Sequence, residues 1–363
     1  MSVRKASLSL GVAACVLLAF GLQAQAADQA AIAKIAEYHG ADRHEMLVEG
    51  ARKEGTLTLY SSMIVDQALQ PLVTAFHKEY PFENVKFVRA DPPQLMQKLL
   101  AEARAQHYVC DVLESTSMEV PTTKAKLVRP FWSPELKAFP ADWLDPGHRW
   151  APTRVSYLGV AYNTKLVDAK DVPHSYDDLL DPKWKGKMAW SSENMGAMLI
   201  ITGIRHFMGE EKADAYLKKL GTQDIAPIAT SNRAVLNRVI AGEYALELDA
   251  FLHHPILSAE KGAPSAPDPI NPVVTVISSV ELPKHAPHPY SAMLFIDFLL
   301  SKKGQTILRD AKYFPAREDV DASPDLNKIV PSKIGMKANF LSPELVNKEY
   351  QKSFEIFKKY FSK

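Results

Sequence analysis

The chain has 363 residues, in which 43 lysines and arginines nearly balance 42 aspartates and glutamates, for a formal net charge of +1. Hydrophobic residues make up 47% and charged residues 23%, which is usual for a globular protein of about two domains. The lack of a strong positive charge argues against nucleic acid as a partner. Beyond the N-terminus, no apolar run approaches the ~20 residues of a membrane-spanning helix.

The first 26 residues have the pattern of a secretory signal peptide. Arg4 and Lys5 precede the apolar segment "LSLGVAACVLLAFGL", and "AQA" at 24–26 supplies small residues for cleavage. We predict cleavage after Ala26 and export to the periplasm. A lipoprotein box at "VAAC" is the alternative, but it would cut inside the apolar segment. Cys110 lies in an apolar run and is predicted to be buried and unreactive.

From residue 56 onward, short β-rich runs alternate with amphipathic helical runs. Strands are predicted at 56–60, 85–89, 110–114, 154–163, 187–191, 225–230, 244–248 and 273–282. Helices are predicted at 66–80, 93–106, 117–128, 196–209, 232–243 and, as one long amphipathic element, 290–308. This alternation predicts an α/β fold with mixed sheets flanked by helices, arranged as two lobes.

Polar residues follow five of the predicted strands. In open α/β sheets, ligands collect beyond the carboxyl ends of strands, where helix N-termini direct N–H groups outward. For one loop alone, helix capping would explain such residues equally well. Their repetition in both lobes favours a ligand cleft, with these candidate residues: Ser61, Ser62, Thr116, Ser192, Asn232, Arg233 and His253.

Four segments carry a family resemblance: "EGTLTLYSS", "SYDDLLDPKWKGKMAW", "AGEYALELD" and "LLSKKGQTIL". They are similar to the periplasmic solute-binding proteins of ABC importers, in the branch that contains ferric-iron-binding proteins. The resemblance implies two lobes joined by crossing strands that close on a solute. We place lobe 1 at residues 27–152 and 273–320, and lobe 2 at 153–272 and 321–363. A cognate inner-membrane ABC permease is the implied partner, and we expect a monomer.

The iron chemistry of that branch is not expected in this chain. The resemblance implies two consecutive tyrosines, a histidine and a glutamate as ligands for Fe(III), a hard ion that prefers oxygen. Ungapped counting puts the tyrosines at Leu252 and His253, the histidine near Ile64 and the glutamate near Thr116. None of the four ligands is retained, so no metal and no other cofactor is expected.

The segment "FLHHP", 251–255, therefore needs another explanation. Pro255 suits the first position of a helix, which would place His253 and His254 at a helix N-terminus as neutral rings. We expect His253 to be a polar solute contact, with a solvent-facing loop histidine as the competing interpretation. A metal site built from the two histidines is a minority interpretation.

The anion-binding part of the family pattern is retained. The resemblance implies a turn at a helix start, matched by Met195, Gly196 and Ala197, and an asparagine, matched by Asn232. Arg233 follows, and a guanidinium there would bind a carboxylate or phosphonate bidentately. Asn232 and Arg233 are both expected to face the open cleft.

These observations predict a binding protein that captures a small anionic organic solute: a phosphonate, phosphate ester, carboxylate or sulfonate. A ferric or ferric-chelate-binding protein is the alternative. An exported hydrolase ranks third, because no nucleophile elbow, phosphate loop or H-E-x-x-H motif is present.

Overall fold

The computed structural model describes residues 30–192 and 195–362, so the predicted signal peptide and its cleavage site lie outside the described residues. Within these ranges, twelve strands join in one mixed sheet, whose main path runs β2-β1-β3-β10-β5-β8-β6-β7. The strands are β1 (Thr56–Ser61), β2 (Asn84–Arg89), β3 (Val112–Thr116), β4 (Val128–Arg129), β5 (Trp150–Asn163), β6 (Met188–Ser191), β7 (Ala226–Ile228), β8 (Leu246–Phe251), β9 (Ser265–Asp268), β10 (Val273–Pro283), β11 (Phe314–Pro315) and β12 (Ala338–Phe340).

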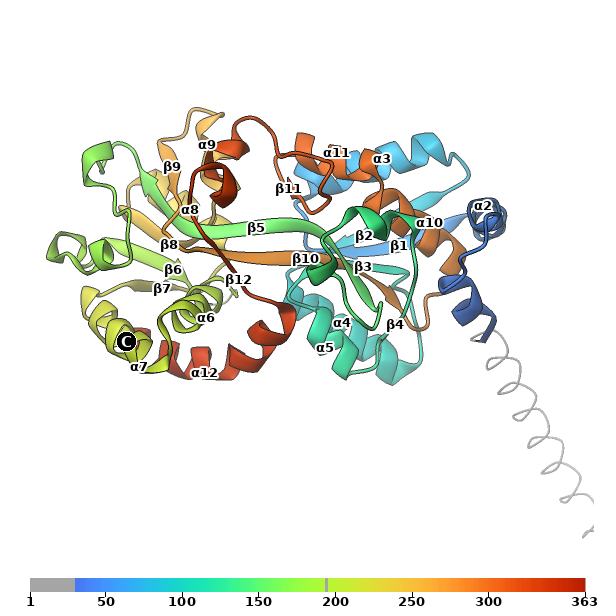
Figure 1. The fold of residues 1–363 in the computed structure, drawn as a ribbon, viewed down its shortest axis with the longest axis horizontal. Helices are drawn as coiled ribbons and strands as arrows, with labels where there is room; N and C mark the ends of the chain where they lie inside the picture. Colours follow the sequence, from blue (N-terminus) through green and yellow to red (C-terminus); the bar gives the residue numbers. More distant parts are fainter. Residues whose placement is uncertain (1–29, 193–194, 363) are drawn as a thin grey trace, which may run out of the picture.

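Helices cover both faces of the sheet (Figure 1). They are α2 (Arg43–Glu54), α3 (Gln70–Glu79), α4 (Pro92–Ala105), α5 (Glu119–Lys124), α6 (Gly196–Met208), α7 (Glu210–Leu220), α8 (Asn232–Ala241), α9 (His253–Ala259), α10 (Pro289–Leu300), α11 (Lys302–Asp310) and α12 (Pro343–Phe361). The predicted α/β class is confirmed. None of the helices in the described ranges is both long and apolar enough to cross a bilayer.

Two long strands connect the two ends of the molecule. β5 and β10 pair in antiparallel register along the long axis of the molecule (Figure 1), from Val274 opposite Leu158 to Glu281 opposite Trp150. All eleven residues of β10 are buried, as expected for a strand covered on both faces. The register shifts between Ser278 and Ser279. These two strands are the crossing strands that the sequence resemblance implied.

Two large hydrophobic clusters lie at either end of the crossing strands. Cluster 1 includes Leu47 of α2, Leu72 and Phe76 of α3, and Phe295 of α10. Cluster 2 includes Trp190 of β6, Leu217 of α7 and Phe357 of α12. Cluster 1 also takes in Leu326 and Ile329, in a segment that the sequence analysis assigned to lobe 2. The exact lobe boundaries stay a prediction.

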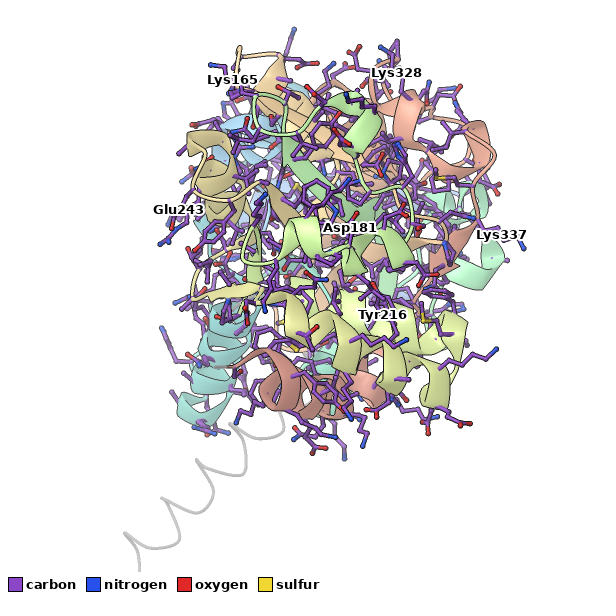
Figure 2. The ribbon with its side chains drawn as sticks, turned by 90° about the vertical axis from the view of Figure 1, so that its left-hand side faces the viewer. Lys165, Asp181, Tyr216, Glu243, Lys328 and Lys337 are labelled. Carbon is purple, nitrogen blue, oxygen red and sulfur yellow. The ribbon has the colours of Figure 1, made fainter. Side chains whose placement is uncertain are left out.

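The surface at the end formed by cluster 2 carries exposed charged side chains. Figure 2 shows Lys165, Asp181 and Glu243 around this end, with Lys328 and Lys337 at its edge. Tyr216 of α7 is buried there, and its hydroxyl donates a hydrogen bond to the Tyr176 carbonyl at 2.7 Å.

Three predicted elements are corrected. The single helix expected at 290–308 is two helices, because Ser301 has an extended backbone and its hydroxyl caps α11 by accepting from the Gly304 N–H. The helix expected at 117–128 is reduced to α5, between Ser117 and Lys126, which both have positive φ. Helix α9 begins at His253, so Pro255 occupies its third position rather than its first.

Cys110 is 2% exposed, as predicted. Burial raises the pKa of its thiol well above the usual range, which disfavours the reactive thiolate.

Candidate functional site

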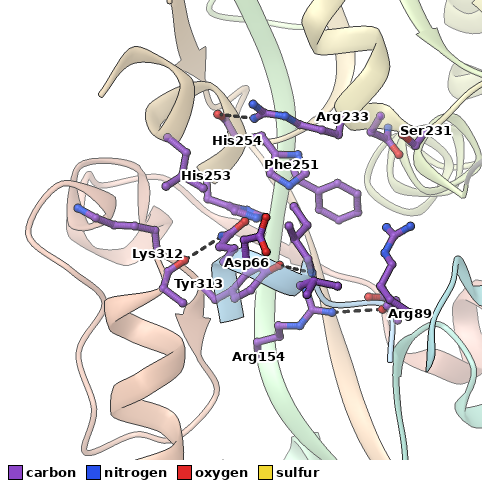
Figure 3. Close-up of a pocket in the computed structure, with 18 of the residues that line it drawn as sticks. Asp66, Arg89, Arg154, Ser231, Arg233, Phe251, His253, His254, Lys312 and Tyr313 are labelled. Carbon is purple, nitrogen blue, oxygen red and sulfur yellow. Dashed lines mark hydrogen bonds between the residues drawn. The ribbon is translucent and has the colours of Figure 1, made fainter. Parts of the chain in front are cut away.

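A cavity of about 840 Å³ is lined by elements of both predicted lobes. Sites for small organic ligands fall in this size range. In the range predicted as lobe 1, Ser62 follows β1 and Thr116 ends β3. In the range predicted as lobe 2, Asn232 and Arg233 begin α8 and His253 begins α9. Figure 3 shows Arg233 and His253 at this cavity.

Six of the ten predicted site residues line this cavity: Ser62, Thr116, Met195, Asn232, Arg233 and His253. The other four do not. Ser61 points instead to Glu114, with 2.7 Å between its Oγ and Oε2. Ser192 donates its backbone N–H to the Ile228 carbonyl at 2.9 Å. Gly196 and Ala197 are buried at the start of α6, behind the wall.

The turn at Met195–Ala197 lies close to a hydrogen-bond acceptor that belongs to the protein itself, the carboxylate of Asp249. The Asp249 carboxylate is fully buried and accepts the Ser191 N–H, at 3.1 Å to Oδ2, as well as the Ala197 N–H. A Cβ at position 196 would overlap both this carboxylate and the Asn232 amide, so the close approach requires glycine. Burial raises the pKa of Asp249, while the Ser191 N–H opposes that shift.

Asn232 does not face an open cleft as expected. It is 1% exposed, and its Nδ2 donates to the backbone carbonyl of Asp249 at 2.8 Å. Ser231, rather than Asn232, caps α8 by accepting the Ala234 N–H. The amide of Asn232 therefore links the start of α8 to the end of β8, and its Oδ1 has no hydrogen-bond partner in the described part of the chain.

Arg233 is half-buried in the cavity wall. One guanidinium nitrogen, Nη1, donates to the His254 carbonyl at 3.2 Å. Among the residues that the structure describes, no carboxylate lies within ion-pair distance of this side chain. Burial lowers the pKa of Arg233, and Glu247 opposes the shift. A guanidinium has five N–H donors, so most of its donor capacity remains for a ligand.

The two histidines are buried, which contradicts the interpretation of a solvent-facing loop. His253 is 2% and His254 is 9% exposed, and their ring centroids lie 4.3 Å apart. Neither ring nitrogen of His253 has a hydrogen-bond partner in residues 30–192 and 195–362. Burial lowers the pKa of His253 well below its ordinary value and that of His254 to about 3. Both rings are therefore neutral at pH 7, as predicted.

Sequence reasoning missed Arg154, which lies in the middle of β5 and lines the cavity at 6% exposure. Its Nε pairs with Glu114 Oε1 at 3.2 Å, and its Nη2 donates to Ser62 Oγ at 3.3 Å. The guanidinium carbon lies 4.7 Å from the centroid of the Tyr313 ring. An arginine as the one charged residue of a long, otherwise uncharged strand was the available signal.

No three His, Cys, Asp or Glu side chains in the described ranges gather closely enough to hold a metal ion. Tyr313 lines the cavity, and burial raises the pKa of its phenol, although Arg154 opposes that shift.

Residues 121–340 match the family model described as bacterial extracellular solute-binding protein. The chain belongs to this family. Members of this family are solute-binding proteins of transporters rather than enzymes, and the resemblance inferred from the sequence is confirmed.

Two curated relatives of this family member have different named solutes. A Salmonella typhi periplasmic protein named for binding 2-aminoethylphosphonate is 28% identical over 196 residues, 50% of this chain and 56% of that protein. The chain thus spans about half the length of this relative. An Fe(3+)-binding periplasmic protein of Serratia marcescens is 25% identical over 333 residues, 89% of this chain and 88% of that protein.

Solved structures show the fold that this family member shares. Iron-bound HitA from Pseudomonas aeruginosa aligns with a TM-score of 0.72 at 23% identity, over 84% of this chain and 99% of that one. AfuA from Actinobacillus pleuropneumoniae, with exogenous fructose-6-phosphate bound, aligns with a TM-score of 0.71 at 22% identity, over 85% of this chain and 98% of that one. At these identities, the likeness concerns the fold alone.

Proposed function

We propose that this protein captures a small anionic organic solute in the cavity and delivers it, from the periplasm, to an inner-membrane ABC permease. The observation that carries the proposal is Arg233, a half-buried cation that lines the cavity without a carboxylate partner among the described residues. A guanidinium without a carboxylate at ion-pair distance, in a partly desolvated wall, favours an anion. The name of the Salmonella relative makes 2-aminoethylphosphonate the first solute to test.

The test is isothermal titration calorimetry of the protein with 2-aminoethylphosphonate, inorganic phosphate, fructose-6-phosphate, citrate and an alkylsulfonate. Arg233→Ala should weaken binding of the preferred anion at least about tenfold, because a charged hydrogen bond contributes roughly 1.5–3 kcal/mol. Arg238→Ala is the matched control, since Arg238 lies on the same helix but pairs with Glu243 at the surface. Equal affinity in Arg233→Ala and wild type would refute the proposal.

A ferric chelate is the second candidate, favoured by the Serratia relative, whose match covers most of the chain. Titration with ferric citrate separates the two candidates. We expect no tyrosinate charge-transfer band, because Tyr313 is the single tyrosine in the cavity lining and no three His, Cys, Asp or Glu side chains of the described ranges gather to hold a metal ion. A strong visible band that disappears in Tyr313→Phe would instead support direct iron binding.

A further inference from the structure

The floor of the cavity holds a second cation whose orientation is fixed from behind. Arg154 extends from β5 to Glu114 of β3, and Glu114 is itself held by Ser61 Oγ at 2.7 Å and Thr153 Oγ1 at 3.1 Å. Two of the five Arg154 N–H groups are used by Glu114 and Ser62. A guanidinium clamped in this way is pre-organised, so a ligand loses little side-chain entropy when it binds there.

His253 lies between the two arginines. In Figure 3 its side chain lies below Arg233 and above Arg154. Both guanidinium groups act electrostatically on the ring, and with His254 and burial they keep it neutral. The ring packs against Tyr313, with centroids 5.0 Å apart, and it stands edge-on to Phe251 and Phe314.

The ring nitrogens of His253 are buried polar atoms without partners in the described ranges, and such atoms are costly unless something satisfies them. A neutral imidazole offers one donor and one acceptor, whereas an oxyanion offers acceptors only. The protonated ring, with two donors, is therefore the better complement to an oxyanion. An anion between the arginines would also offset the positive charges that oppose protonation.

We propose that Arg154 and His253, with the hydroxyls of Ser62 and Thr116, form an oxyanion subsite on the cavity floor, and that His253 takes up a proton from solvent when the subsite is filled. This inference rests on the proposed function and names the part of the solute that the floor recognises: a phosphonate or phosphate group. Such a group has three terminal oxygens, which suits several converging donors better than the two oxygens of a carboxylate.

Other charged groups line the cavity and are part of its electrostatic balance. The Arg89 side chain pairs with Asp91 at 3.0 Å, and Lys312 pairs with Glu260 at 2.9 Å. The remaining charged lining residues are Asp66, Lys261 and Asp310. Among the groups that act on the pKa of His253, the arginines and His254 all lower it, so an anion that neutralises them raises it.

The experiment measures proton uptake directly. Calorimetric titrations of 2-aminoethylphosphonate at pH 6, in buffers of different ionisation enthalpy, give the number of protons bound with each solute molecule. Wild type should take up about half a proton or more beyond His253→Gln, because a ring restored to an ordinary pKa near 6.5 is mostly protonated at pH 6. The solute's own ionisation contributes to both proteins. His107→Gln, an exposed histidine outside the cavity, should match wild type.

Affinity gives the second readout. Because the bound form holds the extra proton, wild-type affinity should fall from pH 6 to pH 8 more steeply than that of His253→Gln. Arg154→Gln should weaken binding at least about tenfold. That variant leaves the Glu114 carboxylate buried without its ion-pair partner. The double variant Arg154→Gln/Glu114→Gln therefore tests the loss of the Arg154 guanidinium without leaving a buried, unpaired carboxylate.

The outcomes separate the two proposals. If no anion in the panel binds wild type, the proposed function fails and the subsite with it. If an anion binds but His253→Gln takes up as many protons as wild type, and the Arg154 variants bind normally, the subsite is wrong and the proposed function stands. Should His253→Gln fail to fold, the same question is answered by NMR of wild-type protein with labelled histidine. The His253 ring should change from neutral to protonated on binding at pH 6, and a ring that stays neutral would overturn the inference.

Discussion

At the scale of single residues, the cavity wall depends on groups behind it as much as on those that face it. Gly196, Asn232 and Asp249 pack against one another where α6 and α8 begin. The Asp249 carboxylate takes the Ser191 and Ala197 N–H groups that would otherwise be available to a bound anion. Under the proposed function, this wall would therefore bind an anion through side chains, Arg233 above all.

Gly196→Ala tests this close packing. Its new methyl group would overlap the Asn232 amide and the Asp249 carboxylate, so the variant should lose about 1–3 kcal/mol in free energy of unfolding, measured by urea denaturation. Combining it with Asn232→Ala should recover part of the steric loss, because the amide is the nearest obstacle. Wild-type stability in Gly196→Ala would show that the start of α6 can move aside.

Strand ends were a good guide to the site, and strand interiors were not considered. Ser62, Thr116, Arg233 and His253 follow or end strands, and the cavity brings them together. Arg154 was missed because the hydrophobic period and the strand propensity of a sequence indicate which residues lie on each face of a strand. They do not indicate which buried position opens onto a cavity. Likewise, no local pattern indicates that Asp249, rather than a ligand, accepts the Ala197 N–H.

At the scale of elements, buried carboxyl groups connect α5 to the crossing strand β10. Glu119 of α5 accepts a hydrogen bond from Ser279 Oγ at 2.8 Å, and Glu281 of β10 accepts one from Thr122 Oγ1 at 2.5 Å. Both carboxyl groups are buried. Burial raises the pKa of Glu119 to about 7 and that of Glu281 well above its ordinary value.

This contact makes stability depend on pH. A carboxyl group with a raised folded-state pKa favours the folded state below the unfolded value, near 4.5, and this contribution is lost as pH rises to about 7. Glu119→Gln should therefore become more stable relative to wild type between pH 4.5 and 7.5, by up to about 3 kcal/mol. Urea denaturation at the two pH values measures the change. Glu355→Gln, on the exposed face of α12, should show none, and a parallel pH profile in Glu119→Gln would contradict the assignment.

Element boundaries were less predictable than element types. The apolar period that predicted one helix at 290–308 continues across Ser301, because α10 and α11 both turn apolar side chains towards cluster 1. The break depends on one residue whose hydroxyl accepts the Gly304 N–H and donates to the Phe298 carbonyl. Serine is compatible with a helix interior and with a cap, so the sequence alone did not distinguish them.

At the scale of the whole molecule, the cavity is lined by elements attached to both hydrophobic clusters, and β5 and β10 connect those clusters. A solute that contacts Arg154 and Arg233 together favours arrangements in which the two walls are close. Small-angle X-ray scattering should show a smaller radius of gyration when a saturating concentration of the preferred anion is added. Arg233→Ala at the same concentration should keep the radius of the free protein. An unchanged wild-type radius at saturation would show that the walls do not move.

The order of strands and helices along the chain predicted the α/β class, but the single connected sheet depends on long-range pairing. β10 lies between β3 and β5, although more than a hundred residues separate it from each of them in sequence. Strand patterns indicate burial and direction, whereas neighbours in a sheet are decided by packing between segments far apart in the chain.

The division between supporting and lining groups has an evolutionary consequence. Glu114 and Asp249 anchor the wall from behind, and Phe251, His253 and Leu257 face the cavity. Mutations among the facing residues alter the shape and charge of the cavity and leave the anchoring residues intact. Each successive mutant can therefore still fold while its solute specificity changes. A scaffold arranged in this way can diversify its cargo through a few substitutions, which fits the different solutes in the names of its relatives.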